Sequence, residues 1–179
     1  LSRLKSAGIN RLSLGIQSFS EKDLRLMHRA HDRKEAENAL KAVTKQFENF
    51  SLDLIYGMPD SSIGDWEESL SLALSYDPPH ISAYALTVEE KTVLHHLVNK
   101  DKVTLLPEET VKEQYDLLVA LLEQKKYINY EFSSFGKPNF FSVNNQNYWN
   151  GKAYLGLGPS AHSFDGQAKR SWNISNNHL

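Results

Sequence analysis

The first half of the chain repeats one pattern three times: a short run rich in β-forming residues, followed by apolar residues at helical spacing. The runs occupy residues 11–19, 50–58 and 80–87, spaced by about the length of one strand plus one helix. Strands joined through helices are parallel, and their crossovers are right-handed. The pattern therefore predicts an α/β fold, as a barrel or an open parallel sheet.

Residues typical of helix N-termini predict where the helices between and after these runs begin. Asp32 with Glu35 and Ser62 with Asp65 have the spacing of capping boxes, and Pro107 precedes two acids at the start of a longer helix. Beyond that helix we expect a half-exposed strand at residues 127–133, because Ile128, Tyr130 and Phe132 alternate with Tyr127, Asn129 and Glu131. The remainder is rich in Gly, Asn and Ser.

Composition excludes several classes of protein. Twenty Lys and Arg against 22 Asp and Glu give a net charge of −2, which argues against nucleic-acid binding. There is no apolar run long enough to span a membrane and no signal segment, so we expect a cytoplasmic protein without a transmembrane segment. With no cysteine, the chain has no disulfide, thiolate zinc site or cysteine nucleophile, and it cannot ligate an iron–sulfur cluster alone.

Three polar residues fall near the carboxyl ends of the expected strands, where ligands bind in parallel α/β proteins: Gln17, Asp53 and Thr87. Asp53 interrupts an apolar run, so its carboxylate needs a partner. That partner is a ligand, a neighbouring turn, or the guanidinium of Arg11 or Arg29.

The histidines allow more than one interpretation. His28 and His31 have a spacing compatible with a metal, but without a nearby set of acids or cysteines they are better interpreted as loop histidines. His162 could ligate a metal or a porphyrin iron, donate to a carboxylate, or be a half-buried histidine with satisfied hydrogen bonds. The glycines of 156–158 lack a dinucleotide or phosphate-loop pattern and favour a tight turn or a close backbone approach.

Four stretches, residues 8–19, 52–59, 80–89 and 154–163, closely resemble the oxygen-independent coproporphyrinogen III oxidase-like radical SAM proteins, and within them the heme chaperone branch. The resemblance implies a barrel of about six βα units that holds S-adenosylmethionine. It also implies a Cys-x3-Cys-x2-Cys loop for a [4Fe–4S] cluster, which this chain lacks.

On this resemblance the fold class is α/β: a partial radical SAM (β/α) barrel of about three βα units, then a mixed α+β segment. Residues 1–105 correspond to the C-terminal half of the barrel, and residues 106–179 to a post-barrel helix, strands and a Gly-rich loop. Because the chain starts at Leu1 and stops without a terminal element, we expect a piece of a longer protein.

The resemblance also assigns a cofactor site. Gln17 and Asp53 match residues against the ribose and methionyl portions of S-adenosylmethionine, Arg29 the arginine that pairs with its carboxylate, and Thr87 a residue on the adenine side. The loop that carries Gly158 and His162 would close over the same pocket.

A porphyrin site follows from the heme chaperone branch, with one departure. Asn144 stands where that branch usually has a histidine, and an amide is a poor ligand for heme iron. Tyr148 and Trp149 keep flat surfaces for stacking on a porphyrin, and His162 is the alternative iron ligand.

Three functions remain at this point. The first is a heme chaperone that binds heme and delivers it to a heme-accepting protein. The second is an oxygen-independent coproporphyrinogen III oxidase, which removes two propionate carboxyl groups by oxidative decarboxylation. The third is a catalytically idle interaction fragment.

Overall fold

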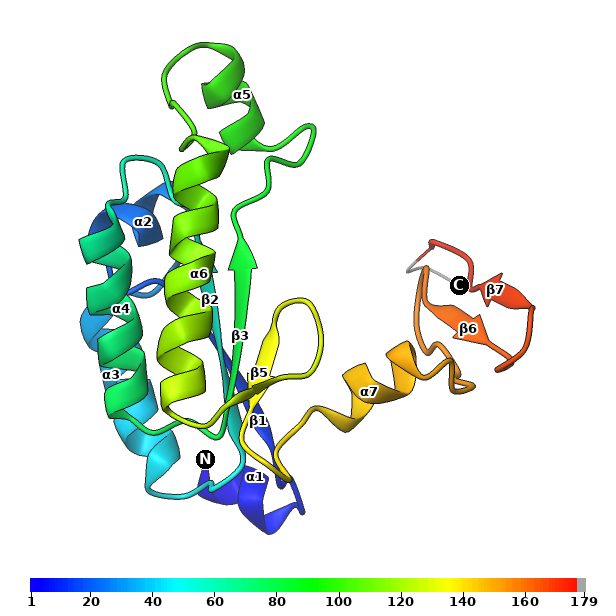
Figure 1. Ribbon diagram of the computed structural model, residues 1–179. Coiled ribbons are helices and arrows are strands. Elements are labelled where there is room, and N and C mark those ends of the chain that lie inside the picture. Colours follow the sequence, from blue (N-terminus) through cyan, green and yellow to red (C-terminus); the bar gives the residue numbers. More distant parts are fainter. Residues whose placement is uncertain (177–179) are drawn as a thin grey trace. The chain divides into compact units, whose positions relative to one another are not determined.

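A computed structural model describes residues 1–176, which divide into two compact units (Figure 1). Unit 1 comprises residues 1–140 and unit 2 begins at Phe141. The boundary that we expect at residue 105 refers to the barrel of the whole protein and stays a prediction.

Unit 1 contains α1 (Ser2–Ser6), β1 (Leu12–Gln17), α2 (Glu21–Leu26), α3 (Arg33–Thr44), β2 (Phe50–Tyr56), α4 (Ile63–Ser75), β3 (His80–Ala85), α5 (Val93–Asn99), α6 (Glu108–Gln124), β4 (Ile128–Asn129) and β5 (Ser134–Gly136). Unit 2 contains α7 (Val143–Trp149), β6 (His162–Phe164) and β7 (Arg170–Trp172). None of the helices within residues 1–176 is long and apolar enough to cross a membrane.

The sheet of unit 1 has the order β1-β2-β3-β5-β4 and is open within the described residues. β1, β2 and β3 are parallel, and β5 and β4 continue the sheet in antiparallel pairing. The α/β fold with parallel strands is thereby confirmed.

The prediction of one strand over residues 127–133 is wrong. Only Ile128–Asn129 is a strand, and the chain then turns back into β5. The alternation is also the reverse of an apolar inner face, since Tyr127 is buried while Phe132 is 82% exposed. The Tyr127 hydroxyl donates to the Pro78 carbonyl, which holds the start of this segment against the loop between α4 and β3.

Three helices cover one face of the sheet, as Figure 1 shows for α3, α4 and α6. The capping boxes at Asp32 and Ser62 both form, as predicted, so α3 and α4 begin where the sequence indicates. Side chains from all three helices, among them Leu40, Leu70 and Leu118, are fully buried in one cluster with Leu52 of β2. Burial of this apolar face is the main stabilisation of unit 1.

The opposite face of the sheet is polar. Successive side chains of a strand point to opposite faces, so the neighbours of the buried leucines in β2 turn away from the helices. The strand register aligns these residues in rows across β1, β2, β3 and β5. We call the part of this surface nearer the amino ends of β2 and β3 the polar face; it comprises Ser13, Gly15, Ser51, Asp53, His80, Ser82 and Ser134. Ile55 and Tyr84 follow on the same side towards the carboxyl ends of β2 and β3.

His80 anchors the polar face near the amino end of β3. Its Nδ1 lies 2.7 Å from Ser51 Oγ, and its Nε2 lies 2.7 Å from the Tyr130 hydroxyl. Burial lowers the pKa of His80 to about 4, so the imidazole is neutral at neutral pH. A neutral ring can donate at one nitrogen and accept at the other, which suits a bridge between two hydroxyls.

We predict that His80 makes the protein sensitive to acid. Between pH 6.5 and 4 the unfolded chain binds a proton at this histidine that the folded chain does not, so its contribution is complete above pH 6.5 and is lost as the pH falls to 4. The loss amounts to about 3 kcal/mol of unfolding free energy. Urea unfolding at several pH values should show a flatter pH dependence for His80→Gln than for the wild type. His96→Gln, at an exposed position of α5, is the control, and equal slopes for wild type and His80→Gln would contradict the prediction.

Candidate functional site

Gln17 is the last residue of β1 and has an unusual conformation. Its φ is +62°, and a bulge shifts the register so that Gln17 rather than Ile16 pairs with Leu54. Its Oε1 is the only buried side-chain oxygen or nitrogen in residues 1–176 without a hydrogen-bond partner. A buried acceptor without a donor is costly, and strained residues concentrate at binding sites.

Asp53 lies in the middle of β2, on the polar face, rather than at the strand's carboxyl end as expected. Ser13 Oγ donates to its carboxylate, at 3.1 Å from Oδ2 and 3.3 Å from Oδ1. Burial raises the pKa of Asp53, an effect that hydrogen bonds from Ser13 and Ser82 and the positive charge of Arg11 partly offset. The described residues include no ion pair at Asp53, so neither Arg11 nor Arg29 neutralises it directly.

Arg29 and Gly15 bring these side chains into one neighbourhood. Gly15 is the register partner of Asp53, and its carbonyl oxygen lies 3.5 Å from Arg29 Nη2. The Gln17 amide folds back over the Cα of Gly15, where a Cβ would lie 2.5 Å from Gln17 Nε2. The structure thus gathers Gln17, Arg29 and Asp53 around Gly15.

Thr87 is not part of the group around Gly15; it lies beyond the carboxyl end of β3. It follows β3, is exposed, and donates its hydroxyl hydrogen to the Ala85 carbonyl. It lines a cavity of about 610 Å³ together with Tyr84, Tyr115 and Phe132. This cavity is aromatic and lies beside the carboxyl half of β3.

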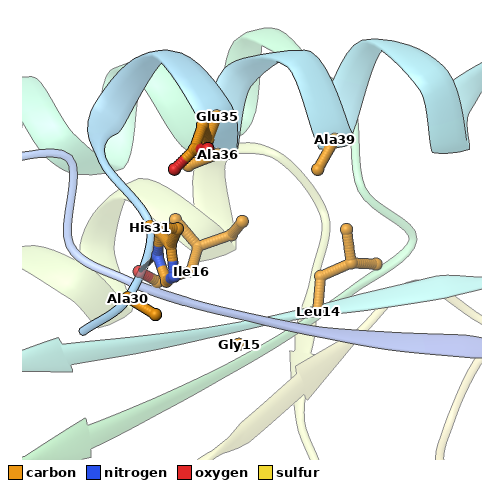
Figure 2. Close-up of a pocket in the computed structure, with 8 residues that line it drawn as sticks. All are labelled: Leu14, Gly15, Ile16, Ala30, His31, Glu35, Ala36 and Ala39. Carbon is orange, nitrogen blue, oxygen red and sulfur yellow. Dashed lines mark hydrogen bonds between the residues drawn. The ribbon is translucent and has the colours of Figure 1, made fainter.

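A second cavity, of about 500 Å³, opens between β1 and α3 (Figure 2). Gly15 lines it, and Figure 2 shows the His31 imidazole beside Ile16. His31 Nε2 is 3.2 Å from the Ile16 carbonyl oxygen, which ties the loop after α2 to the end of β1. Within residues 1–176 no three His, Asp or Glu side chains gather as a metal site.

Unit 2 carries the remaining predicted residues: Asn144, Tyr148, Trp149, Gly158 and His162. Gly158 lies in a loop held by Asn173, whose Nδ2 donates to the carbonyls of Gly156 at 3.1 Å and Gly158 at 2.9 Å. Asn144 is exposed on α7. The prediction that the 156–163 loop closes over the pocket at Gln17 concerns both units and stays a prediction.

Aromatic rings connect α7 to the small sheet of unit 2. Tyr148 stacks on Tyr154 with ring centres 4.7 Å apart, and Tyr154 contacts Phe164 of β6 at 6.1 Å. On the same strand, the His162 ring meets the Trp172 ring edge-on at 5.5 Å. The side chains of Tyr148 and Trp149 are 52% and 60% exposed.

Sequence reasoning missed the residues that surround Asp53 and Gln17. Ser13, Gly15 and Ser82 are small, and each looks unremarkable by itself. Their signal is a period of two: small or polar residues alternate with apolar ones in all three parallel strands. That period indicates a sheet with one apolar and one polar face, and here most side chains of the polar face are buried as well.

Comparison with known proteins shows which family this chain resembles. Residues 1–73 match the radical SAM superfamily. This part of the chain belongs to the radical SAM superfamily. The heme chaperone HemW of Bacillus subtilis is 38% identical over 164 residues, which are 91% of this chain and 43% of that protein. The heme chaperone HemW of Synechocystis is 40% identical over 161 residues, 89% of this chain and 39% of that protein.

A solved structure of a radical SAM enzyme has the same fold. Coproporphyrinogen III oxidase (HemN) from Escherichia coli matches 98% of this radical SAM chain and 43% of its own length, with a TM-score of 0.75 and 22% identity. The structure shows the fold alone; with the superfamily match and the HemW relatives, the resemblance to the coproporphyrinogen III oxidase-like radical SAM family is confirmed.

This radical SAM chain spans about two fifths of the length of the curated relatives it matches. Membership of the superfamily implies S-adenosylmethionine and a [4Fe–4S] cluster for the whole protein, and this chain contains no cysteine.

Gly156 supports a prediction about the fold of unit 2. A Cβ at this position would lie 2.2 Å from the backbone oxygen of His162, which cannot move without disturbing β6. Gly156→Ala should destabilise unit 2 by about 1–3 kcal/mol. Hydrogen exchange should then speed up at the amides of Tyr154 and Phe164, which pair across the sheet. Gly64→Ala is the control, since its Cβ would meet only Ser62 Oγ at 3.7 Å; unchanged protection in Gly156→Ala would refute the prediction.

Proposed function

We propose that the full-length protein is a radical SAM heme chaperone, which binds heme and delivers it to a heme-accepting protein. The observation that carries this proposal is the similarity to proteins named heme chaperone HemW over about nine tenths of the chain, at 36–40% identity in three bacteria. A cytoplasmic location belongs to the same proposal.

S-adenosylmethionine fits the groups gathered around Gly15. The buried Oε1 of Gln17 has no donor, and a ribose hydroxyl or the methionyl ammonium can supply one. The Asp53 carboxylate, hydrogen-bonded to Ser13, retains lone pairs for ribose hydroxyls. Arg29 would pair with the cofactor carboxylate, a contact for which a guanidinium is well shaped.

Three further residues complete the proposed site: Thr87 on the adenine side, and Gly158 and His162 in the covering loop. When bound at a reduced cluster, S-adenosylmethionine supplies radical chemistry. The cluster ligands would come from outside this chain, because it has no cysteine.

For heme, we propose the exposed aromatic residues of unit 2 as the contact surface. The exposed side chains of Tyr148 and Trp149 would contact the porphyrin, and His162 would offer its imidazole to the iron. Asn144 is exposed on α7, about one helical turn before Tyr148, and belongs to the same proposed surface. Its amide can hydrogen-bond a propionate but is a poor iron ligand.

Oxygen-independent coproporphyrinogen III oxidase is the second candidate. Asn144 favours it, because the histidine that is usual in the heme chaperone branch is absent. A catalytically idle fragment is disfavoured, because Gln17, Arg29 and Asp53 still meet around Gly15.

Asp53→Ala tests the cofactor site. In the full-length, cluster-reconstituted protein it should weaken S-adenosylmethionine binding by about 1–3 kcal/mol, the scale for losing hydrogen bonds to a charged group. Isothermal titration calorimetry measures the change. Asp116→Ala, which removes an exposed carboxylate of α6 paired with Lys112, should bind like the wild type. Equal affinities for Asp53→Ala and the wild type would remove Asp53 from the site.

Hemin titration separates the two functions. The full-length protein should give a stoichiometric Soret shift and no decarboxylation of coproporphyrinogen III, and His162→Ala should lose the shift because the imidazole ligates the iron. His96→Ala, at the exposed position of α5, is the control. Decarboxylation without tight heme binding would instead identify an oxidase, and a Soret shift that survives in His162→Ala would exclude this ligand.

A further inference from the structure

Gly15 stands out because its missing side chain leaves room for one particular group. The three heavy atoms nearest to a Cβ built at Gly15 all belong to the Gln17 side chain: Nε2 at 2.5 Å, Oε1 at 3.3 Å and Cδ at 3.4 Å. A methyl group and the Gln17 amide therefore cannot occupy this place together.

The backbone holds Gln17 so that its side chain folds back over the strand. The φ of +62° at Gln17 is rare for a residue with a side chain, and the bulge at Ile16 accompanies it. The Ser18 N–H donates to the Ile16 carbonyl at 2.8 Å, which closes a tight turn around Gln17. His31 contacts the same carbonyl at 3.2 Å, so the turn is held from two sides.

The backbone of Gly15 does not itself require glycine. Its φ lies outside the left-handed region, unlike that of Gly57 or Gly158. The three heavy atoms nearest to an added Cβ are at the end of a flexible side chain, not in the backbone. Alanine therefore suits the strand itself, and the need for glycine comes from the Gln17 amide.

The place that the amide occupies is next to the other polar groups of the site. Asp53 is the cross-strand partner of Gly15, and Arg29 Nη2 lies 3.5 Å from the Gly15 carbonyl oxygen. The amide in this position presents a buried, unpaired Oε1. A displaced amide would lose this arrangement while leaving Asp53 and Arg29 in place.

We infer that Gly15 is a positioning residue of the S-adenosylmethionine site: its lack of a side chain seats the Gln17 amide over β1, beside Asp53, where its oxygen accepts from the cofactor. This inference rests on the proposed function. It assigns to Gly15 no contact of its own with the cofactor, because the residue acts through Gln17.

The test is a double-mutant cycle on the full-length, cluster-reconstituted protein, with S-adenosylmethionine affinity measured by isothermal titration calorimetry. Gly15→Ala and Gln17→Ala should each weaken binding roughly tenfold, the scale for losing one hydrogen bond. The double variant should bind like Gln17→Ala alone, because the methyl group has room once the amide is gone. Gly64→Ala, a glycine-to-alanine change with ordinary contacts, should bind like the wild type.

Two further measurements separate positioning from a loss of fold. The thermal unfolding midpoint of Gly15→Ala should stay near that of the wild type, and its crystal structure should show the Gln17 amide displaced from β1. If Gly15→Ala unfolds early but the double variant is as stable as Gln17→Ala, the collision is still with the amide and the inference stands.

The outcomes distinguish this inference from the proposed function. Weaker binding by Gln17→Ala with wild-type binding by Gly15→Ala overturns the role of Gly15 and leaves the cofactor site intact. Additive losses in the double variant also overturn it, because Gly15 would then act independently of Gln17. Wild-type binding by Gln17→Ala removes Gln17 from the site and overturns both the placement of the cofactor and the role of Gly15.

Discussion

The parallel pairing of β1, β2 and β3 in one register is what the rest of unit 1 depends on, because it sorts side chains onto two faces with opposite chemistry. One face is apolar and is closed by three helices whose inner residues are fully buried. The other carries serines, a histidine, an aspartate and a glycine in rows. A slip of one residue in any strand would exchange these faces, so the apolar core enforces the position of every polar group opposite it.

The two ends of the polar face differ in how far their polar groups are hydrogen-bonded within the protein. Near the amino ends of the strands, His80 is neutral and joins two hydroxyls, so its hydrogen-bonding capacity is used within the protein. Towards the carboxyl end of β1, the buried Oε1 of Gln17 has no hydrogen-bond donor. Burial disfavours the charged form of Asp53 and raises its pKa. An acceptor without a donor and a carboxylate with a raised pKa are suited to bind a polar ligand.

Glycine has a different role in each unit, although both roles come from close approach. In unit 1, Gly15 leaves space that the Gln17 amide occupies, and a Cβ at Gly15 would displace only the end of that flexible side chain. In unit 2, Gly156 lies against the backbone of His162, so the strand pairing itself depends on the missing side chain. The same residue type thus adjusts a site in one unit and permits a fold in the other.

The sequence by itself determined the strand–helix repeat, the starts of α3 and α4 and the family, because apolar spacing, capping residues and motifs are local. It misjudged residues 127–133, where the burial of Tyr127 and the pairing of β5 with β3 overrode local alternation. Only the tertiary structure showed that Asp53 lies in mid-strand with Ser13 as its partner, and that Gly15 makes room for Gln17. These relations depend on register and on a bulge, which arise when strands pair and which no single stretch of sequence encodes.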